Sequence, residues 1–223
     1  MGTYDEQAGP SAAKPISIAI IGSGFGGLGM AHYLKQADIH SFTIFEKSQD
    51  LGGVWRDNVY PGAACDVASH FYSFAFEPHY PWSRRYGPQQ EIHAYLAHVA
   101  DKYDIRRHIR FGCEVSGAAF DEARGLWVLR LTDGATHEAQ VLICAVGQLN
   151  RPKLPELAGL EKFRGHVFHS AHWDHAYDFR GKTVAVIGTG PSAVQFVPAI
   201  APLVKQLHVY QRSTSWTLPK WDG

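Results

Sequence analysis

The sequence predicts an α/β protein with two parallel βαβ units, and three observations support this prediction. A nearly continuous apolar run at residues 16–21 is followed by a glycine-rich loop, a helical stretch and a second apolar run. The same order of elements returns after Lys182. In both places the glycines stand between a strand and a helix, where the backbone must turn tightly. A strand, a helix and a strand at this spacing are typical of a parallel βαβ unit.

Composition narrows the classes of function. The chain has 223 residues, of which 45% are hydrophobic, so it can bury a core. The 21 basic residues balance the 21 acidic ones, and no basic excess draws the chain to nucleic acid or to an anionic membrane. The three cysteines contain no C-x-x-C pair, which argues against a disulfide framework or a cysteine-rich zinc site. We therefore expect a soluble, cytoplasmic protein.

Residues 1–14 are polar and rich in Gly, Ala and Pro, unlike a signal peptide, and we expect a disordered tail there. The longest apolar run, 16–21, is far below the ~20 residues that cross a bilayer. No membrane-spanning segment is expected.

The first unit is expected to cover residues 15–150. It begins with a buried strand at 16–21, a helix at 28–36 and a strand at 42–46. Residues 48–87 are rich in Gly, Pro and aromatic residues and are expected to form ordered loops. Pro88 suits the first turn of a further helix. The apolar stripe of this helix consists of Ile92, Tyr95, Leu96 and Val99.

Short β runs at 109–115 and 126–131 follow this helix, with a hairpin turn at Asp133-Gly134. The apolar run 141–146 is expected to be a buried strand that returns to the main sheet. Residues 151–180 are expected to form a linker, which opens with a Pro-rich stretch. Residues 181–223 begin a second unit with strands at 183–187 and 207–210. Two strands and one helix are too few for an independent nucleotide-binding domain, so this unit is expected to be truncated.

The first glycine loop has the pattern G-x-G-x-x-G. Gly22 permits the tight turn, Gly24 lets a pyrophosphate approach the backbone, and Gly27 lets the helix and strand pack closely. The helix N-terminus favours the anion. Glu46, with Lys47 beside it, stands where a carboxylate accepts hydrogen bonds from an adenosine ribose. An ordinary glycine turn is the alternative. The whole loop comprises Gly22, Ser23, Gly24, Phe25, Gly26 and Gly27.

The second glycine loop has the pattern G-x-G-x-x-A and comprises Gly188, Thr189, Gly190, Pro191, Ser192 and Ala193. Glu46 follows Gly22 by 24 positions, and the same count from Gly188 ends at Arg212. A guanidinium can pair with a 2′-phosphate, and Ser213 can add a hydroxyl donor. The alternative for Arg212 is a solvated charge at a strand end. The first loop therefore favours FAD and the second favours NADPH.

Two dinucleotide sites with opposite ribose preferences imply electron transfer from NADPH to a flavin. Disulfide reductases need a cysteine pair near the flavin, and Cys65 has no partner close in sequence. The predicted fold is that of an α/β flavoprotein with two dinucleotide-binding domains. It combines a Rossmann-like FAD domain, into which a β-meander is inserted, with a truncated NADP-binding Rossmann unit.

Two further segments carry a family resemblance. The residues 52–55 (G-G-V-W), 60–62 (Y-P-G) and Asp66 resemble the long signature of Baeyer–Villiger monooxygenases. Their shorter fingerprint, F-x-G-x-x-x-H-x-x-x-W-P/D, is similar to the stretch that contains Phe163, Gly165, His169, Trp173 and Asp174. Flavin monooxygenases that oxidise sulfur or nitrogen share both glycine loops and are the alternative within enzymes.

The resemblance implies that NADPH reduces FAD, that O2 adds to the flavin, and that the peroxyflavin attacks a small carbonyl substrate to give an ester or lactone. It implies that Asp66 lies near the flavin and helps to set the charge around the peroxide. It implies that His169 and Trp173 couple cofactor binding to domain movement. The flavin site would also include Gly53, Val54, Trp55 and Tyr72, with the backbone of Val115 at the adenine.

The same resemblance implies parts that are absent here. The catalytic arginine of the family and the rest of its NADP domain lie beyond Gly223. We therefore expect little activity from this chain alone, with a complementing C-terminal chain as a candidate partner. A non-catalytic FAD-binding remnant, or one half of a split enzyme, is the alternative from another class.

Four histidines recur at every third position from His166 to His175 and raise the question of a metal site. This stretch contains Gly165 and is expected to be a loop. In a loop, a spacing of three residues does not bring the imidazole rings to one face, as it would in a helix. No metal site is expected.

Overall fold

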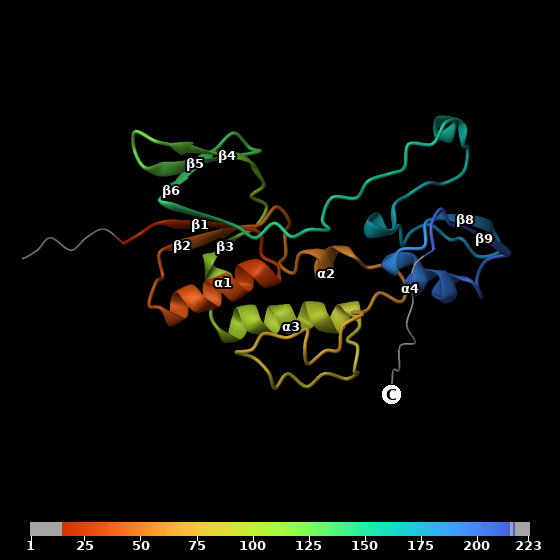
Figure 1. Cartoon of the computed structure of the whole chain (residues 1–223), viewed down its shortest axis with the longest axis horizontal. Coiled ribbons are helices and arrows are strands. Elements are labelled where there is room, and N and C mark those ends of the chain that lie inside the picture. Colours follow the sequence, from red (N-terminus) through yellow and green to blue (C-terminus); the bar gives the residue numbers. More distant parts are fainter. Residues whose placement is uncertain (1–14, 215, 217–223) are drawn as a thin grey trace, which may run out of the picture.

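The computed structural model describes residues 15–214 and 216. The predicted tail at 1–14 and the last residues of the predicted 181–223 domain lie outside this part. The described chain is elongated, with the first βαβ unit at one end and the second at the other (Figure 1). An irregular linker leads from one unit to the other.

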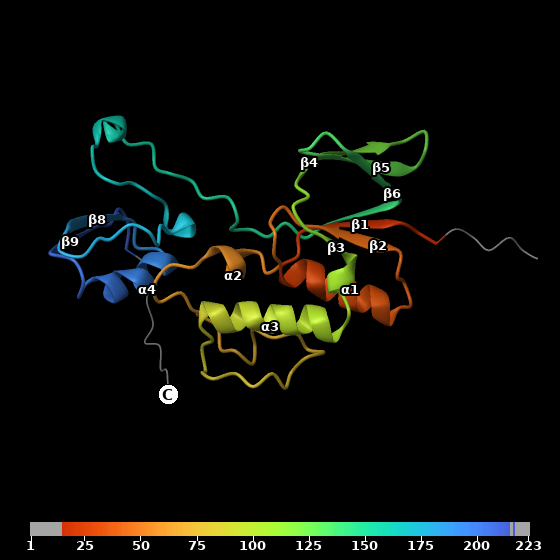
Figure 2. The same ribbon diagram turned by 180° about the vertical axis from the view of Figure 1, so that it is seen from behind.

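A four-stranded parallel sheet organises the first unit. Its strand order is β3-β2-β1-β7, so β1 and β2 lie in the middle. The carboxyl ends of these parallel strands face the linker and the second unit (Figures 1 and 2). The strands are β1 (Ile18–Ile21), β2 (Phe42–Phe45), β3 (Ile109–Arg110) and β7 (Val141–Cys144).

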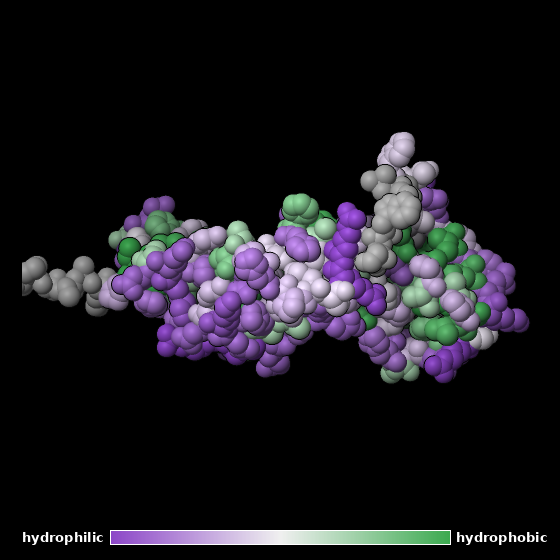
Figure 3. Space-filling view, turned by 90° about the horizontal axis from the view of Figure 1, so that it is seen from below, coloured by the Kyte–Doolittle hydropathy of each residue, from purple (hydrophilic) through white to green (hydrophobic). Residues whose placement is uncertain are grey.

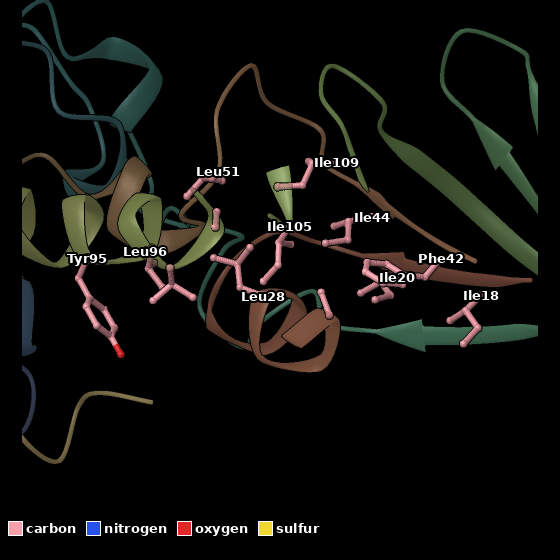
Figure 4. Close-up of a cluster of buried hydrophobic side chains, with 13 residues drawn as sticks. Ile18, Ile20, Leu28, Phe42, Ile44, Leu51, Tyr95, Leu96, Ile105 and Ile109 are labelled. Atoms are coloured by element: carbon pink, nitrogen blue, oxygen red, sulfur yellow. The ribbon is translucent and has the colours of Figure 1, made fainter. Parts of the chain in front are cut away.

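Two helices cover one face of this sheet, α1 (Phe25–Gln36) and α3 (Gln89–Lys102) (Figure 1). The predicted apolar stripe of α3 is confirmed, because all four of its side chains are at most 1% exposed. Three of them, Tyr95, Leu96 and Val99, belong to the main core that also contains Ile20, Ile44 and Leu28 (Figure 4). Helix α1 begins at Phe25, three residues before the predicted start, because the glycines of the loop already adopt helical backbone.

An antiparallel meander covers the opposite face. It consists of β4 (Val115–Asp121), β5 (Leu126–Leu131) and β6 (Thr136–Ala139). The predicted run 109–115 is divided, since Gly112 turns the chain at φ +65° between β3 and β4. The predicted turn at Asp133-Gly134 is confirmed, with Gly134 at φ +88°.

Strand β7 returns to the main sheet as predicted, but the expectation that its whole run is buried was wrong. Val141 is 39% exposed and Val146 is 49% exposed. Within residues 15–214, β7 pairs only with β1 and is an edge strand, so its outer side meets solvent.

The described part of the second unit contains the two strands and the helix that were predicted. Strands β8 (Thr183–Ile187) and β9 (Gln206–Tyr210) are parallel, and α4 (Pro191–Ile200) connects them. Its buried cluster contains Val186, Ala193, Phe196 and Ile200. Shorter helices complete the chain: α2 (Val54–Asp57) and 3-10 turns at Arg106–His108, Leu160–Lys162 and Ser170–His172.

Hydrophobic side chains also gather on the surface of the second unit (Figure 3). Ile187, Val194 and Tyr210 are each more than half exposed. None of the helices in the described part of the chain is long and apolar enough to span a bilayer.

Candidate dinucleotide site

The first glycine loop connects the end of β1 to the start of α1. Gly22 has φ +100°, and a Cβ atom there would lie 2.6 Å from the carbonyl oxygen of Ala145. A Cβ atom at Gly27 would lie 1.9 Å from the carbonyl oxygen of Gly22. These two positions therefore exclude any side chain because the backbone is packed too closely.

Gly24 differs from these two glycines. The nearest atom to a Cβ built there is the Cα of Gly53, at 3.8 Å, which is ordinary contact. Gly24 is the N-cap of α1, and neither a capping side chain nor an acidic residue occupies the first turn. The N–H groups of this turn therefore form a site that favours an anion.

Glu46 directly follows β2 and is buried at 4% exposure. Its Oε2 accepts hydrogen bonds from the N–H (3.0 Å) and the hydroxyl (2.6 Å) of Ser23, and its Oε1 accepts one from the N–H of Ser48 (3.0 Å). Burial alone would raise the pKa of Glu46, but these hydrogen bonds and the charge of Arg56 outweigh burial and lower the pKa. The carboxylate is therefore ionised at neutral pH.

Arg56 is a residue that the sequence reasoning missed. It lies in α2 and donates from Nη1 to Oε1 of Glu46 (3.0 Å) and to the carbonyl of Asp50 (2.6 Å). It also forms two hydrogen bonds with the carboxylate of Asp57. Each oxygen of Glu46 thus already accepts two hydrogen bonds, so a ribose hydroxyl must share or replace one of them. A basic residue directly after the G-G-x-W segment was the signal that could have revealed Arg56.

Three predicted aromatic residues meet beside the loop. The indole Nε1 of Trp55 donates to the hydroxyl of Tyr72 (2.9 Å), and the rings of Phe25 and Tyr72 pack edge to face with centroids 4.9 Å apart. Burial raises the pKa of Tyr72, and the charges of Cys65 and Asp66 raise it further against the opposing effect of Trp55. Exposed Asp66 therefore lies within electrostatic range of this cluster.

A cavity of about 390 Å³ opens at the carboxyl end of the sheet. This volume lies within the usual range of small-molecule sites. Its walls come from the chain after β2, from α2, from the chain after β7 and from the linker. They include Lys47, Ser48, Val54, Asp57, Asn58, Val59, Leu149, Asn150, Pro152, Ala171, His172 and Trp173.

Predicted residues Lys47 and Val54 thus line this cavity. Val115 is not among its lining residues. It packs at the start of β4 with the small core that contains Phe45 and Leu129.

The second glycine loop repeats the backbone geometry of the first. The N–H of Gly188 donates to the carbonyl of Tyr210 (2.9 Å), as the N–H of Gly22 donates to that of Phe45 (2.8 Å). Gly188 has φ +106°, and Gly190 caps α4 without a side-chain hydrogen bond.

The other residues of this loop differ in exposure. Thr189 and Ser192 are half-buried, Pro191 is exposed and opens the helix, and Ala193 is buried. No atom lies within 4 Å of a Cβ built at Gly188 or Gly190, so a ligand has room to approach.

The strand registers correct the predicted equivalence of Arg212 and Glu46. Register pairs Ile21 with Phe45 in the first unit and Ile187 with Tyr210 in the second. The second unit has one residue fewer between its glycine and its strand end. The position of Glu46 is therefore taken by Gln211, and Arg212 corresponds to Lys47. Arg212 and Ser213 both follow β9 and are exposed.

Two of the linker histidines have local partners. His166 pairs with Asp174 (2.9 Å) and stacks on Tyr177, while Nδ1 of His169 accepts from the N–H of Ala171 (3.0 Å). Within residues 15–214, no group of three or more His, Cys, Asp or Glu side chains is placed to hold a metal ion. Trp173 packs against Phe196 of α4 and joins the linker to the second unit.

Two glycine loops of this geometry, each between a parallel strand and the N-terminus of a helix, define an α/β protein with two dinucleotide-binding units. The family model described as flavin-binding monooxygenase-like matches residues 15–222. The chain belongs to this family.

Similarity to individual proteins agrees with this family. A Baeyer-Villiger monooxygenase of Pseudomonas aeruginosa is 50% identical over 216 residues, which cover 97% of this chain and 41% of that protein. Cyclohexanone monooxygenase in an ε-caprolactone-bound structure has a TM-score of 0.87 at 35% identity, covering 93% of this chain and 41% of that one. The structure of OTEMO in complex with FAD and NADP has a TM-score of 0.83 at 34% identity, covering 90% and 39%. The chain thus spans about 40% of the length of the relatives it matches.

Proposed function

We propose that the chain is the FAD- and NADPH-binding portion of a Baeyer–Villiger type monooxygenase, which uses O2 to convert a small ketone into an ester or lactone. The observation that carries this proposal is the repeated backbone geometry of the two glycine loops, of which the first lies beside the cluster of Trp55, Tyr72 and Asp66. The relatives support it, because one is named for Baeyer–Villiger chemistry and another is bound to a lactone.

FAD fits the first unit. The open backbone at Gly24 and the uncapped N-terminus of α1 would hold the pyrophosphate, and the ionised Glu46 would face the ribose. Lys47 and Val54 line the adjoining cavity. When bound, FAD supplies the redox centre that accepts a hydride from NADPH and activates O2.

The residues near the flavin would then control charge and access. Because its pKa is raised, Tyr72 stays protonated at neutral pH and keeps the hydroxyl that Trp55 binds. Asp66 would hold a negative charge beside this hydroxyl, and we propose it as the catalytic candidate of this chain. Trp55 and Phe25 would exclude water from the same side of the site.

NADPH fits the second unit. The uncapped N-terminus of α4 and the open space at Gly190 would accept the pyrophosphate. Neutral Gln211 replaces the carboxylate of the first unit, and Arg212 and Ser213 follow it. A phosphorylated ribose would therefore meet no negative charge at this strand end and would find a guanidinium donor.

The exposed apolar surface of the second unit supports a complementing C-terminal segment as a partner. An apolar cavity of about 130 Å³ there is lined by Thr189, Ala193, Val194, Val197, Pro198 and Val209. The chain covers only 41% of the Pseudomonas relative, so the relative has further sequence that could supply such a segment. We expect low ketone oxidation without it. The free thiols of Cys113 and Cys144 support a reducing compartment such as the cytoplasm.

Binding and turnover test the proposal separately. Purified chain incubated with FAD and then desalted is expected to retain a flavin absorbance spectrum. Mixing it with NADPH, O2 and a cyclic ketone is expected to give lactone only when a complementing C-terminal segment is added. A sulfide substrate serves as the comparison, because preferential sulfoxide formation would favour heteroatom oxidation. Retention of no flavin would overturn the proposal.

A further inference from the structure

Helix α4 of the second unit contacts the first unit through the side chain of Gln195. Its Oε1 accepts hydrogen bonds from the hydroxyl of Tyr60 (3.1 Å) and from the N–H of Ala64 (3.2 Å). Its Nε2 donates to the carbonyl of Ala64 (2.8 Å). The side-chain amide of Gln195 thus pairs with both the N–H and the carbonyl of Ala64, as the backbone of a neighbouring β-strand would.

The backbone of the two segments approaches closely at the same place. Gly62 has φ +78°, and a Cβ atom there would lie 2.8 Å from the carbonyl oxygen of Gln195. The ring of Tyr60 also meets Phe196, with centroids 6.2 Å apart. Residues 60–64 therefore lie directly against α4, and any larger side chain at Gly62 would separate them.

The opposite side of this segment is fixed to α3. The N–H of Cys65 donates to the carbonyl of Gly87 (2.9 Å), and the N–H of Gln89 donates to that of Ala63 (2.9 Å). Residues 63–65 are therefore held between the start of α3 and the middle of α4. Asp66 is the next residue along the chain.

We propose that Gln195 is a positioning residue, which fixes the second glycine loop relative to the segment that leads to Asp66. It lies five residues after Gly190, on the helix whose N-terminus would receive the NADPH pyrophosphate. Its displacement would move that N-terminus relative to the flavin site. This inference rests on the proposed function for its consequence, but the contact itself exists in the cofactor-free chain.

An amide is required at this position because it offers an acceptor and a donor together. Gln195→Met keeps the length of the side chain and removes both hydrogen bonds to Ala64. Amide hydrogen exchange of Ala64 is expected to become about fivefold faster in this variant, the factor that one lost hydrogen bond produces. Gln206→Met on exposed β9 is the matched control and should leave Ala64 unchanged.

Gln195→Glu provides a rescue that a purely packing role would not show. At pH 7 its carboxylate repels the carbonyl oxygen of Ala64, and this repulsion is expected to displace the side chain so that the N–H of Ala64 loses its acceptor. At pH 4 a protonated carboxyl group regains a donor and resembles the amide. The protection factor of Ala64 is therefore expected to be low at pH 7 and near that of the wild type at pH 4, with the wild type measured at both pH values.

Loading with FAD tests the positioning itself. FAD is expected to slow amide exchange in α4 of the wild type and to have no such effect in Gln195→Met. The inference is overturned if FAD binds and slows amide exchange in α4 equally in the wild type and in Gln195→Met. It is also overturned if FAD binds and changes exchange in α4 of neither protein. If FAD does not bind, the proposed function fails, while the Ala64 measurements still decide whether Gln195 holds this segment. Should Gln195→Met not fold, Tyr60→Phe removes a single donor and is expected to accelerate Ala64 exchange to a smaller extent.

Discussion

Arg56 donates a hydrogen bond to Glu46 over 3.0 Å, and the Glu46 carboxylate in turn accepts two hydrogen bonds from Ser23 of the first glycine loop. The side chains of Arg56 and Glu46 are 14% and 5% exposed. The conformation of the loop is thus connected through one buried carboxylate to a guanidinium in α2. This connection makes Arg56 important for the site although it follows the motif and is not part of it.

Replacing Arg56 by Met should destabilise the fold because the buried Glu46 loses its cationic partner. We expect the free energy of unfolding to fall by about 3 kcal/mol. Urea unfolding followed by circular dichroism measures this change. Arg124→Met, which removes the exposed ion pairs with Asp121 and Glu138, is the control and should cost much less than the loss of Arg56. Equal losses in the two variants would contradict the role given to Arg56.

The first glycine loop allows folding and ligand binding to be separated. Gly24→Ala should fold normally, since its Cβ meets only ordinary contact at 3.8 Å, but should bind FAD at least about tenfold more weakly because the methyl group occupies the open backbone. Gly27→Ala should lose stability as well, since its Cβ would lie 1.9 Å from a carbonyl oxygen. Thermal unfolding and flavin fluorescence titration distinguish the two effects. Unchanged FAD affinity in a folded Gly24→Ala protein would refute the pyrophosphate site.

Stability at low pH should depend on Glu77. Burial alone would raise its pKa, but hydrogen bonds from Lys102, Tyr103 and His98 lower the pKa to about 2. Because this value lies below the ordinary 4.5, the stabilisation is complete above about pH 4.5 and is lost as the pH falls toward 2.

Glu77→Gln tests this dependence. The variant should be roughly 1–3 kcal/mol less stable than the wild type at pH 6, and this difference should shrink by pH 3. Urea unfolding at the two pH values provides the measurement. Tyr103→Phe, which removes a single donor to Glu77, should give an intermediate loss at pH 6. A difference that stays constant with pH would show that Glu77 does not titrate as described.

Discrimination between the two nicotinamide dinucleotides should depend on Arg212. Arg212→Ala is expected to weaken NADP+ binding by about tenfold or more while leaving NAD+ binding unchanged, because only NADP+ carries the 2′-phosphate. Isothermal titration with both dinucleotides checks this, and Lys205→Ala, another exposed cation of the second unit, is the control. Parallel losses for NADP+ and NAD+ would assign Arg212 a general electrostatic effect instead.

The local patterns predicted most of the fold. The apolar stripe from Ile92 to Val99 determines which face of α3 is buried, and the glycines at 22 and 27 are required by backbone contacts. Features that depend on residues far apart in the sequence were harder to predict. The exposure of Val141 depends on which strands flank β7, and hydrophobicity alone does not report this neighbour.

The site shows the same division. Counting positions from the first glycine of each loop made Arg212 the equivalent of Glu46. The strand registers instead make Gln211 the equivalent, because the second unit is one residue shorter between its glycine and its strand end, and a motif does not report this difference. Arg56 was missed although its partner Glu46 is only ten positions away, because the dinucleotide motif does not include it. Gln195 was missed because its partners lie in a segment that becomes its neighbour only after folding. Gln195 is 131 positions from Ala64.

Trp173 contacts both the large cavity and the core of the second unit. Its indole forms part of the wall of the 390 Å³ cavity and packs on Phe196 within the buried cluster of the second unit. A molecule that fills this cavity therefore touches a side chain that also packs against the buried cluster of the second unit. Filling of the cavity and packing of the second unit therefore depend on the same aromatic ring.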